Sequence, residues 1–150
     1  MDRAIYLLLL LYADDQKPIM GNLKLQKLTF LIQKEVIEKG KRVSDENYNF
    51  LPYRFGPFTP AIYDEIETLK QYGLVEVKET RRGTYYMLSP KGKKLIETLL
   101  LKKVIPVSLL KAIEKIKKKY STMDLNKLIR LIYANYPEFA QRSEWVIESI

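Results

Sequence analysis

The 150-residue chain contains neither cysteine nor histidine. These two absences exclude a disulfide framework, a thiol nucleophile, an imidazole acid or base, and a zinc site built from cysteine and histidine. A chain without cysteine is typical of a reducing compartment, and we expect a cytoplasmic location. The sequence also lacks a phosphate-binding glycine loop and a nucleophile-elbow motif. We therefore predict a non-enzymatic protein with no metal site and no cofactor.

Long hydrophobic runs are absent as well. The longest run, Ile5 to Ala13, is about half of the roughly 20 residues that a membrane span requires. Arg3 precedes it, and Asp14 and Asp15 follow it in place of a small-residue cleavage site. This pattern predicts a buried helix from Asp2 to Ala13 and no membrane partner.

The whole chain has a formal net charge of +8, and acidic residues are scarce in one part of it. Nine basic and two acidic residues lie between Lys102 and Arg130, whereas four acidic and two basic residues lie between Tyr48 and Val77. A basic balance favours a polyanionic partner, and the uneven distribution indicates where that partner binds.

The segment from Tyr53 to Gly92 is the most informative part of the sequence. Gly56-Pro57 predicts a turn, and Thr59 followed by Pro60 predicts the start of a helix. Two β-rich runs, 74–78 and 84–88, then flank a basic loop and predict a hairpin, and Ser89-Pro90 predicts a further helix. A winged helix has its elements in this order.

Helical periodicity accounts for most of the remaining chain. Asn22 is the predicted N-cap of a helix that ends at Gly40, and further helices follow Pro106, the Thr122–Asp124 segment and Ser143. We predict a single domain, residues 1–150, that is mainly α with a small β-hairpin. Its winged helix-turn-helix-like core covers residues 1–102, and C-terminal helices cover residues 103–150.

The basic hairpin tip is the strongest candidate for a nucleic-acid contact. Lys78, Arg81 and Arg82 have the chemistry for phosphate, since a guanidinium group binds phosphate oxygens in a forked, charge-assisted manner. The alternative is a solvated turn whose charges only keep the strand edge soluble.

The predicted helix before the hairpin argues against base reading in the major groove. Its polar positions include Asp64, Glu65 and Glu67. Three carboxylates repel the phosphate backbone, so a winged helix here does not imply sequence-specific DNA binding.

A second basic feature is the lysine run of the first helix after Pro106. We expect its lysines on the exposed back of an amphipathic helix, as a phosphate-binding stripe, a surface for an acidic protein, or a solvated face. These residues are Lys115, Lys117, Lys118 and Lys119.

An aromatic cluster precedes the predicted turn. Core packing is favoured over base stacking, because only Arg54 is interleaved with these rings. The cluster consists of Tyr48, Phe50, Tyr53, Phe55 and Phe58.

Three segments together resemble a known family: LKLQKLTFLIQ at 23–33, YRFGPFTPAIYDEIETLKQYGLVE at 53–76 and LIRLIYANYPEF at 128–139. In this order they are similar to the YwgA-like proteins and the Panacea (SocA-like antitoxin) domain. The resemblance implies a compact, mostly helical domain that acts through protein contacts, as an antitoxin or an adaptor. The implied signature residues are Leu25, Gln26, Lys27, Leu28, Gly56, Pro57 and Tyr63.

Two hypotheses for function follow. One is a regulatory protein that binds nucleic acid, DNA in preference to RNA, through the basic hairpin and the lysine-rich helix. The other is an antitoxin-like or adaptor module with a protein partner, for which the winged helix is the scaffold. For the signature residues Gln26-Lys27 and Gly56-Pro57 a purely structural role is favoured, in which Gln26 bonds a neighbouring loop and Gly56-Pro57 shapes a turn. By analogy with winged-helix proteins, the first helix or the Trp145 segment is a candidate homodimer contact.

Overall fold

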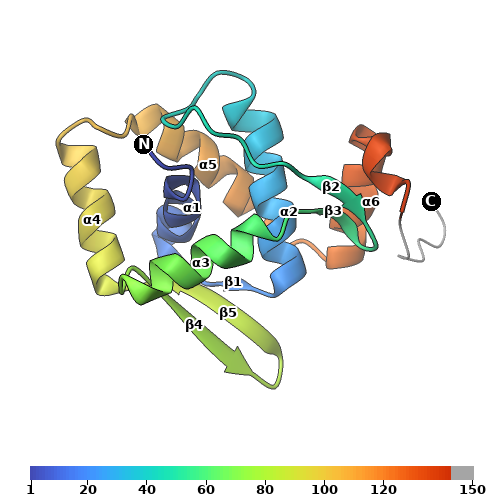
Figure 1. Cartoon of the computed structure of the whole chain (residues 1–150), viewed down its shortest axis with the longest axis horizontal. Coiled ribbons are helices and arrows are strands. Elements are labelled where there is room, and N and C mark those ends of the chain that lie inside the picture. Colours follow the sequence, from blue (N-terminus) through green and yellow to red (C-terminus); the bar gives the residue numbers. More distant parts are fainter. Residues whose placement is uncertain (143–150) are drawn as a thin grey trace.

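The computed structural model of this protein describes residues 1–142, and this part of the chain is mainly helical (Figure 1). The predicted final helix from Ser143 and the Trp145 segment lie outside the described residues. The helical segments are α1 (Ile5–Gln16), α2 (Asn22–Ile32), its π-helical continuation (Gln33–Ile37), α3 (Ala61–Gln71), α4 (Pro90–Leu101), α5 (Val107–Tyr120), α6 (Leu125–Asn135) and a short 3-10 helix (Pro137–Ala140).

The strands form two small antiparallel sheets. One has the order β1-β5-β4 and the other pairs β2 with β3. The class predicted from the sequence, mainly α with a small β-hairpin, is therefore confirmed. The strands are β1 (Ile19–Met20), β2 (Leu51–Tyr53), β3 (Gly56–Phe58), β4 (Val75–Thr80) and β5 (Gly83–Leu88).

Helix α1 forms the centre of the core. Residues 5 to 11 are all buried, because α5, β5, α4 and α2 pack around this helix (Figure 1). A helix that is apolar on every side requires such enclosure. The predicted buried helix is confirmed, but it begins at Ile5, three residues later than predicted, and its backbone leaves the helical conformation at Ala13.

Helix α2 is also surrounded by protein, and two glutamines on it bind the long segment that connects it to α3. The Gln26 side chain donates to the carbonyl oxygen of Thr59 at 2.8 Å and accepts from the Thr59 N–H at 3.1 Å. Gln33 pairs with the backbone of Tyr48 in the same way, at 2.9 and 2.6 Å. Each amide side chain satisfies one buried N–H and one buried C=O that no strand partner reaches. The predicted contact of Gln26 with a neighbouring loop is confirmed.

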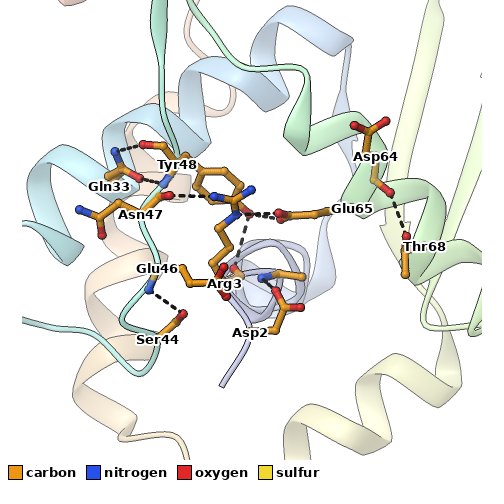
Figure 2. Close-up of polar contacts among 11 residues, drawn as sticks. Asp2, Arg3, Gln33, Ser44, Glu46, Asn47, Tyr48, Asp64, Glu65 and Thr68 are labelled. Atoms are coloured by element: carbon orange, nitrogen blue, oxygen red, sulfur yellow. Dashed lines mark hydrogen bonds and ion pairs between the residues drawn. The ribbon is translucent and has the colours of Figure 1, made fainter.

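A polar network fixes α3 against the N-terminal segment (Figure 2). The Arg3 Nε donates to Glu65 Oε2 at 2.7 Å, and the Tyr48 hydroxyl donates to Glu65 Oε1 at 2.5 Å. The Arg3 guanidinium also lies over the Tyr48 ring, 4.6 Å from its centroid. Burial, with Glu65 beside it, raises the pKa of Tyr48, so its hydroxyl remains a donor. Three segments distant in sequence are joined by this carboxylate.

The predicted hairpin is confirmed, and its strands are longer than expected. Thr80 pairs with Gly83 in the register, so Arg81 and Arg82 alone form the tip. Gly83 has φ +130°, a conformation that residues with a Cβ rarely adopt.

Two predicted helix caps are confirmed. The hydroxyl of Ser89 accepts from the Gly92 N–H at 3.0 Å, and the carboxylate of Asp124 accepts from the Lys127 N–H at 3.1 Å. Thr59 does not cap α3, because the helix begins one residue later than predicted, at Ala61, so that Pro60 has the cap position and no side chain caps the helix.

Two further boundaries differ from prediction. Gly21 precedes α2, so Asn22 is the first helical residue and not the cap. The turn predicted at Gly56-Pro57 lies two residues earlier, at residues 54–55. Gly56 is instead the first residue of β3 and has φ +95°.

The aromatic cluster divides between core and surface. Phe50 is buried with its ring 5.3 Å from that of Phe30, edge to face, and Tyr48 is buried beside it. Core packing is confirmed for these two rings. Tyr53 is exposed and stacks on Phe58, with the ring centroids 4.8 Å apart.

The C-terminal helices share the core with the rest of the chain. Ile113 of α5 and Leu128 of α6 belong to the same buried cluster as the α1 leucines. Among the described helices, none combines the length and apolar character needed to cross a membrane.

Candidate nucleic-acid interface

The hairpin places its three candidate basic residues in solvent. Lys78, Arg81 and Arg82 are all exposed, and the two arginines lie at the tip of the β4–β5 hairpin. The Thr80 hydroxyl accepts from the Arg82 N–H at 3.1 Å and donates to the Gly83 carbonyl at 3.0 Å. A side chain therefore holds the backbone of the tip, and both guanidinium groups stay available to a ligand.

The lysine run of α5 does not share one environment. Lys115, Lys118 and Lys119 are exposed as predicted, but Lys117 is completely buried. The prediction that Lys117 binds nucleic acid is wrong. Ile113, Lys117 and Tyr120 are spaced four and three residues apart, so Lys117 belongs to the buried stripe of the helix.

Lys117 instead completes the end of α1. The backbone of this helix becomes non-helical at Ala13, which leaves its last carbonyl groups without helical partners. The Lys117 ammonium donates to Ala13 O at 2.6 Å and to Leu11 O at 3.4 Å. Glu114, one turn earlier, accepts from the Asp14 N–H at 2.9 Å. Burial lowers the pKa of Lys117 to about 8.

The hairpin tip and the end of α5 meet at one groove of about 690 Å³. The wall on one side includes Arg82, and the opposite wall is the turn that joins α5 to α6. The groove is lined by Lys17, Pro18, Met20, Gly21, Asn22, Leu23, Lys24, Arg82, Ser121, Thr122, Met123 and Leu125.

This groove combines an apolar surface with basic side chains. Met20 of β1 is 49% exposed, and Leu23, Met123 and Leu125 are partly exposed beside it. The charged residues that line the groove are Lys17, Lys24 and Arg82, all basic. An anionic ligand with an apolar portion therefore fits it chemically. The sequence does not reveal this site, because its residues come from three separate segments, 17–24, Arg82 and 121–125.

Lys24 fixes the far wall of the groove. Its ammonium group donates to Ser121 O at 3.0 Å and also to Met123 O, which joins α2 to the α5–α6 turn. Burial lowers the pKa of Lys24 below its ordinary value, while nearby Asp124 acts in the opposite direction. Lys24 has a structural role and at the same time adds positive charge to the groove.

The outer face of α3 has the opposite character. Asp64 and Glu67 are exposed, and a smaller pocket of about 240 Å³ between α3 and the hairpin includes Glu67 and Glu79 with the single basic residue Lys70. Carboxylates there repel phosphate. The charged residues that line the 690 Å³ groove are, by contrast, all basic.

The family-signature residues lie inside the molecule and not at the groove. Leu25 and Leu28 belong to the core, Gln26 binds the Thr59 backbone, and Tyr63 is half-buried beside Gln26. Their arrangement holds the segment between α2 and α3 in place and does not form an open site.

Lys27, Gly56 and Pro57 form one tight contact in this interior. The Lys27 ammonium lies 3.2 Å from Pro57 O, and burial lowers its pKa to about 7. A Cβ at Gly56 would be only 3.0 Å from Lys27 Cε. Sequence periodicity places Lys27 off the apolar stripe of α2, but the β2–β3 hairpin and α6 cover this side of the helix. Burial of Lys27 therefore follows from tertiary packing.

The groove offers basic charge and an apolar surface. The described residues contain no group of carboxylates arranged to bind a metal ion. The chain matches no protein-family model, no curated protein sequence and no solved structure, so the groove itself is the basis for a function.

Proposed function

We propose that this protein binds nucleic acid, DNA in preference to RNA, by contacts to the phosphate backbone. The observation that carries the proposal is that Arg82 of the hairpin lines the same groove as Lys17, Lys24 and the turn that follows α5. Lys78 and Arg81 are exposed on the same hairpin as Arg82, and Lys118 and Lys119 are exposed in the last turn of α5, a few residues before the groove-lining Ser121. Lys115 is exposed one turn earlier on α5.

The fold that we propose for this role is a winged helix with β4 and β5 as the wing. The order α1-β1-α2-α3-β4-β5, with β2 and β3 inserted between α2 and α3, and the pairing of β1 with β5 support this arrangement. In it α3 has the place of the recognition helix, but Asp64 and Glu67 on its exposed face oppose insertion into the major groove. The proposed contact is therefore made by the wing and α5, with little reading of base edges.

Salt dependence tests this proposal. Fluorescence anisotropy with a labelled DNA duplex should give an association constant that falls steeply as NaCl increases, because each phosphate contact releases counterions. The double variant Arg81→Ala/Arg82→Ala should lower the slope of log K against log salt by about 2, since each contact contributes roughly 0.9.

A matched control removes the same charge elsewhere. Lys102 and Lys103 are exposed in the turn between α4 and α5, and neither lines the groove. The variant Lys102→Ala/Lys103→Ala should keep the wild-type slope. Absence of salt-sensitive binding by the wild type, or equal slopes for both double variants, would contradict the proposal.

A protein partner is the second candidate function, in agreement with the resemblance to antitoxin and adaptor domains. The observation that favours it is an apolar patch at the α4–α5 turn, where Leu101 is 85%, Val104 45% and Val107 52% exposed. Such a patch is typical of an interaction site. Co-purification with the product of a neighbouring gene, lost in Leu101→Asp, tests this candidate, and unchanged recovery with the variant contradicts it.

A further inference from the structure

The groove beside the wing is more than a phosphate-binding surface, because much of its lining is apolar. Phosphate contacts require exposed cations and hydrogen-bond donors, and α5 already presents these on its surface. A phosphate contact makes no use of apolar side chains such as those of Met20, Leu23, Met123 and Leu125. Their partial exposure indicates a ligand that has an apolar part to cover these side chains as well as a charged part.

The size of the groove limits the ligand. A volume of about 690 Å³ lies within the usual range for small-molecule pockets, which is roughly 300–1,000 Å³. A stacked base pair in a continuous duplex cannot enter such a hollow, since its faces are covered by neighbouring pairs. An unpaired base with its sugar and phosphate has a flat apolar face on one side and charge on the other.

The polar groups of the groove are placed for such a ligand. The Arg82 guanidinium has no hydrogen-bond or ion-pair partner among the described residues, whereas its backbone is fixed by Thr80. The Lys17 ammonium is largely exposed and has only a 3.7 Å contact with Asp14. The Asn22 side-chain oxygen already accepts from the Tyr86 hydroxyl, which leaves its amide N–H groups and the Thr122 hydroxyl as groups that can bind the edge of a base.

We propose that the groove binds one unpaired nucleotide, with the base on the apolar floor formed by Met20, Leu23, Met123 and Leu125 and the phosphate at Arg82 and Lys17. This inference rests on the proposed nucleic-acid binding and adds a ligand class to it. The nucleotide is part of a DNA strand, such as an overhang, or a free nucleoside monophosphate. Both have the same recognition chemistry.

The first experiment compares two labelled DNA probes by anisotropy: a blunt duplex and the same duplex with a short thymidine overhang. The overhang should increase the affinity about fivefold or more, because it buries the exposed apolar floor. Equal affinities, or tighter binding of the blunt duplex, overturn the inference. Salt-sensitive binding of the blunt duplex then still supports the proposed function, so the two failures are distinguishable.

Two pairs of variants locate the effect. Arg82 lines the groove and Arg81 does not. Arg82→Ala should remove most of the preference for the overhang, whereas Arg81→Ala should weaken the binding of both probes equally.

The second pair tests the apolar floor of the groove. Met20→Thr removes apolar area from an exposed strand position and should also abolish the preference for the overhang. Leu51→Thr, at a position that is 55% exposed on β2, is its control. Retention of the preference in both Arg82→Ala and Met20→Thr overturns the inference.

Competition identifies the source of the nucleotide. Displacement of the overhang probe by thymidine monophosphate at millimolar concentration indicates a free nucleotide ligand, and displacement only by a single-stranded oligonucleotide indicates a strand. Either result supports the inference. If polyglutamate displaces the probe as effectively as the oligonucleotide does, the groove is a site for an acidic polypeptide. That result overturns the inference.

Discussion

The ammonium nitrogen of Lys117 lies 2.6 Å from the carbonyl oxygen of Ala13, at the point where the backbone of α1 ceases to be helical. A buried lysine of α5 thus satisfies the end of the central helix, and its neighbours Lys118 and Lys119 remain in solvent. One run of lysines in the sequence therefore has two roles, and substitution separates them.

Lys117→Met should destabilise the fold by about 1–3 kcal/mol, since methionine fills the volume but leaves the Ala13 and Leu11 carbonyl groups without a donor. It should leave the salt dependence of DNA binding unchanged. Lys118→Met, at an exposed site, should change stability by less than about 0.5 kcal/mol and lower the salt slope by about 1. Urea unfolding and anisotropy measure the two effects. The same pattern in both variants would show that this division of roles is wrong.

Lys27 and Lys117 should make the stability of the fold increase between pH 7 and 9. Their folded-state pKa values, about 7 and about 8, lie below the ordinary 10.5, so the unfolded chain binds more protons in this interval. The free energy of unfolding therefore rises as the pH increases. Near pH 10 the tyrosines of the unfolded chain ionise, while burial raises the pKa of Tyr86 to about 12, and the trend reverses.

Urea unfolding at several pH values measures this dependence. Lys27→Met removes the larger of the two contributions, so the rise between pH 7 and 9 should become smaller in this variant. Lys34→Met, at a partly exposed position of the same helical segment, should retain the wild-type rise. A flat profile in the wild type contradicts the prediction.

Much of the local structure is predictable from the sequence, whereas the groove is not. Gly83 and Ser89-Pro90 indicate the β4–β5 hairpin and the start of α4 through local backbone chemistry, and both predictions are confirmed. The groove depends on tertiary packing that brings Arg82 and Thr122, from distant segments, to the same hollow. The apolar stripe of α5 through Ile113 and Tyr120 is visible in the sequence, and Lys117 lies four residues after the first and three before the second, so helical spacing could have revealed its burial. Periodicity could not reveal Lys27, because strands from elsewhere cover it.

Glu65→Gln should destabilise the fold by about 1–3 kcal/mol. The neutral amide loses the ion pair with Arg3, and it accepts from Tyr48 with only one uncharged oxygen. Glu67→Gln is the matched control, because Glu67 is exposed on the same helix. Thermal unfolding of both variants measures the loss of stability. Equal melting temperatures would mean that the network in Figure 2 contributes little to the stability of the fold.

Gly56→Ala should cost about 1–3 kcal/mol, since φ is +95° and the new Cβ would be 3.0 Å from Lys27 Cε. Gly40→Ala isolates the backbone strain, because Gly40 has φ +101° and a Cβ at this position would meet no neighbouring group within 4 Å. It should cost about 1 kcal/mol. The difference between the two variants, measured by urea unfolding, gives the steric contribution of Lys27. No difference would place that contribution at zero.

Amide chemical-shift mapping tests the location of the interface most directly. When the overhang duplex is added to the isotopically labelled protein, shifts should be concentrated at Met20, Lys24, Arg82 and Thr122, with smaller shifts at the last turn of α5. The exposed face of α3 around Asp64 and Glu67 should remain unchanged. Shifts confined to that face of α3, or no shifts at low salt, would contradict the proposed interface.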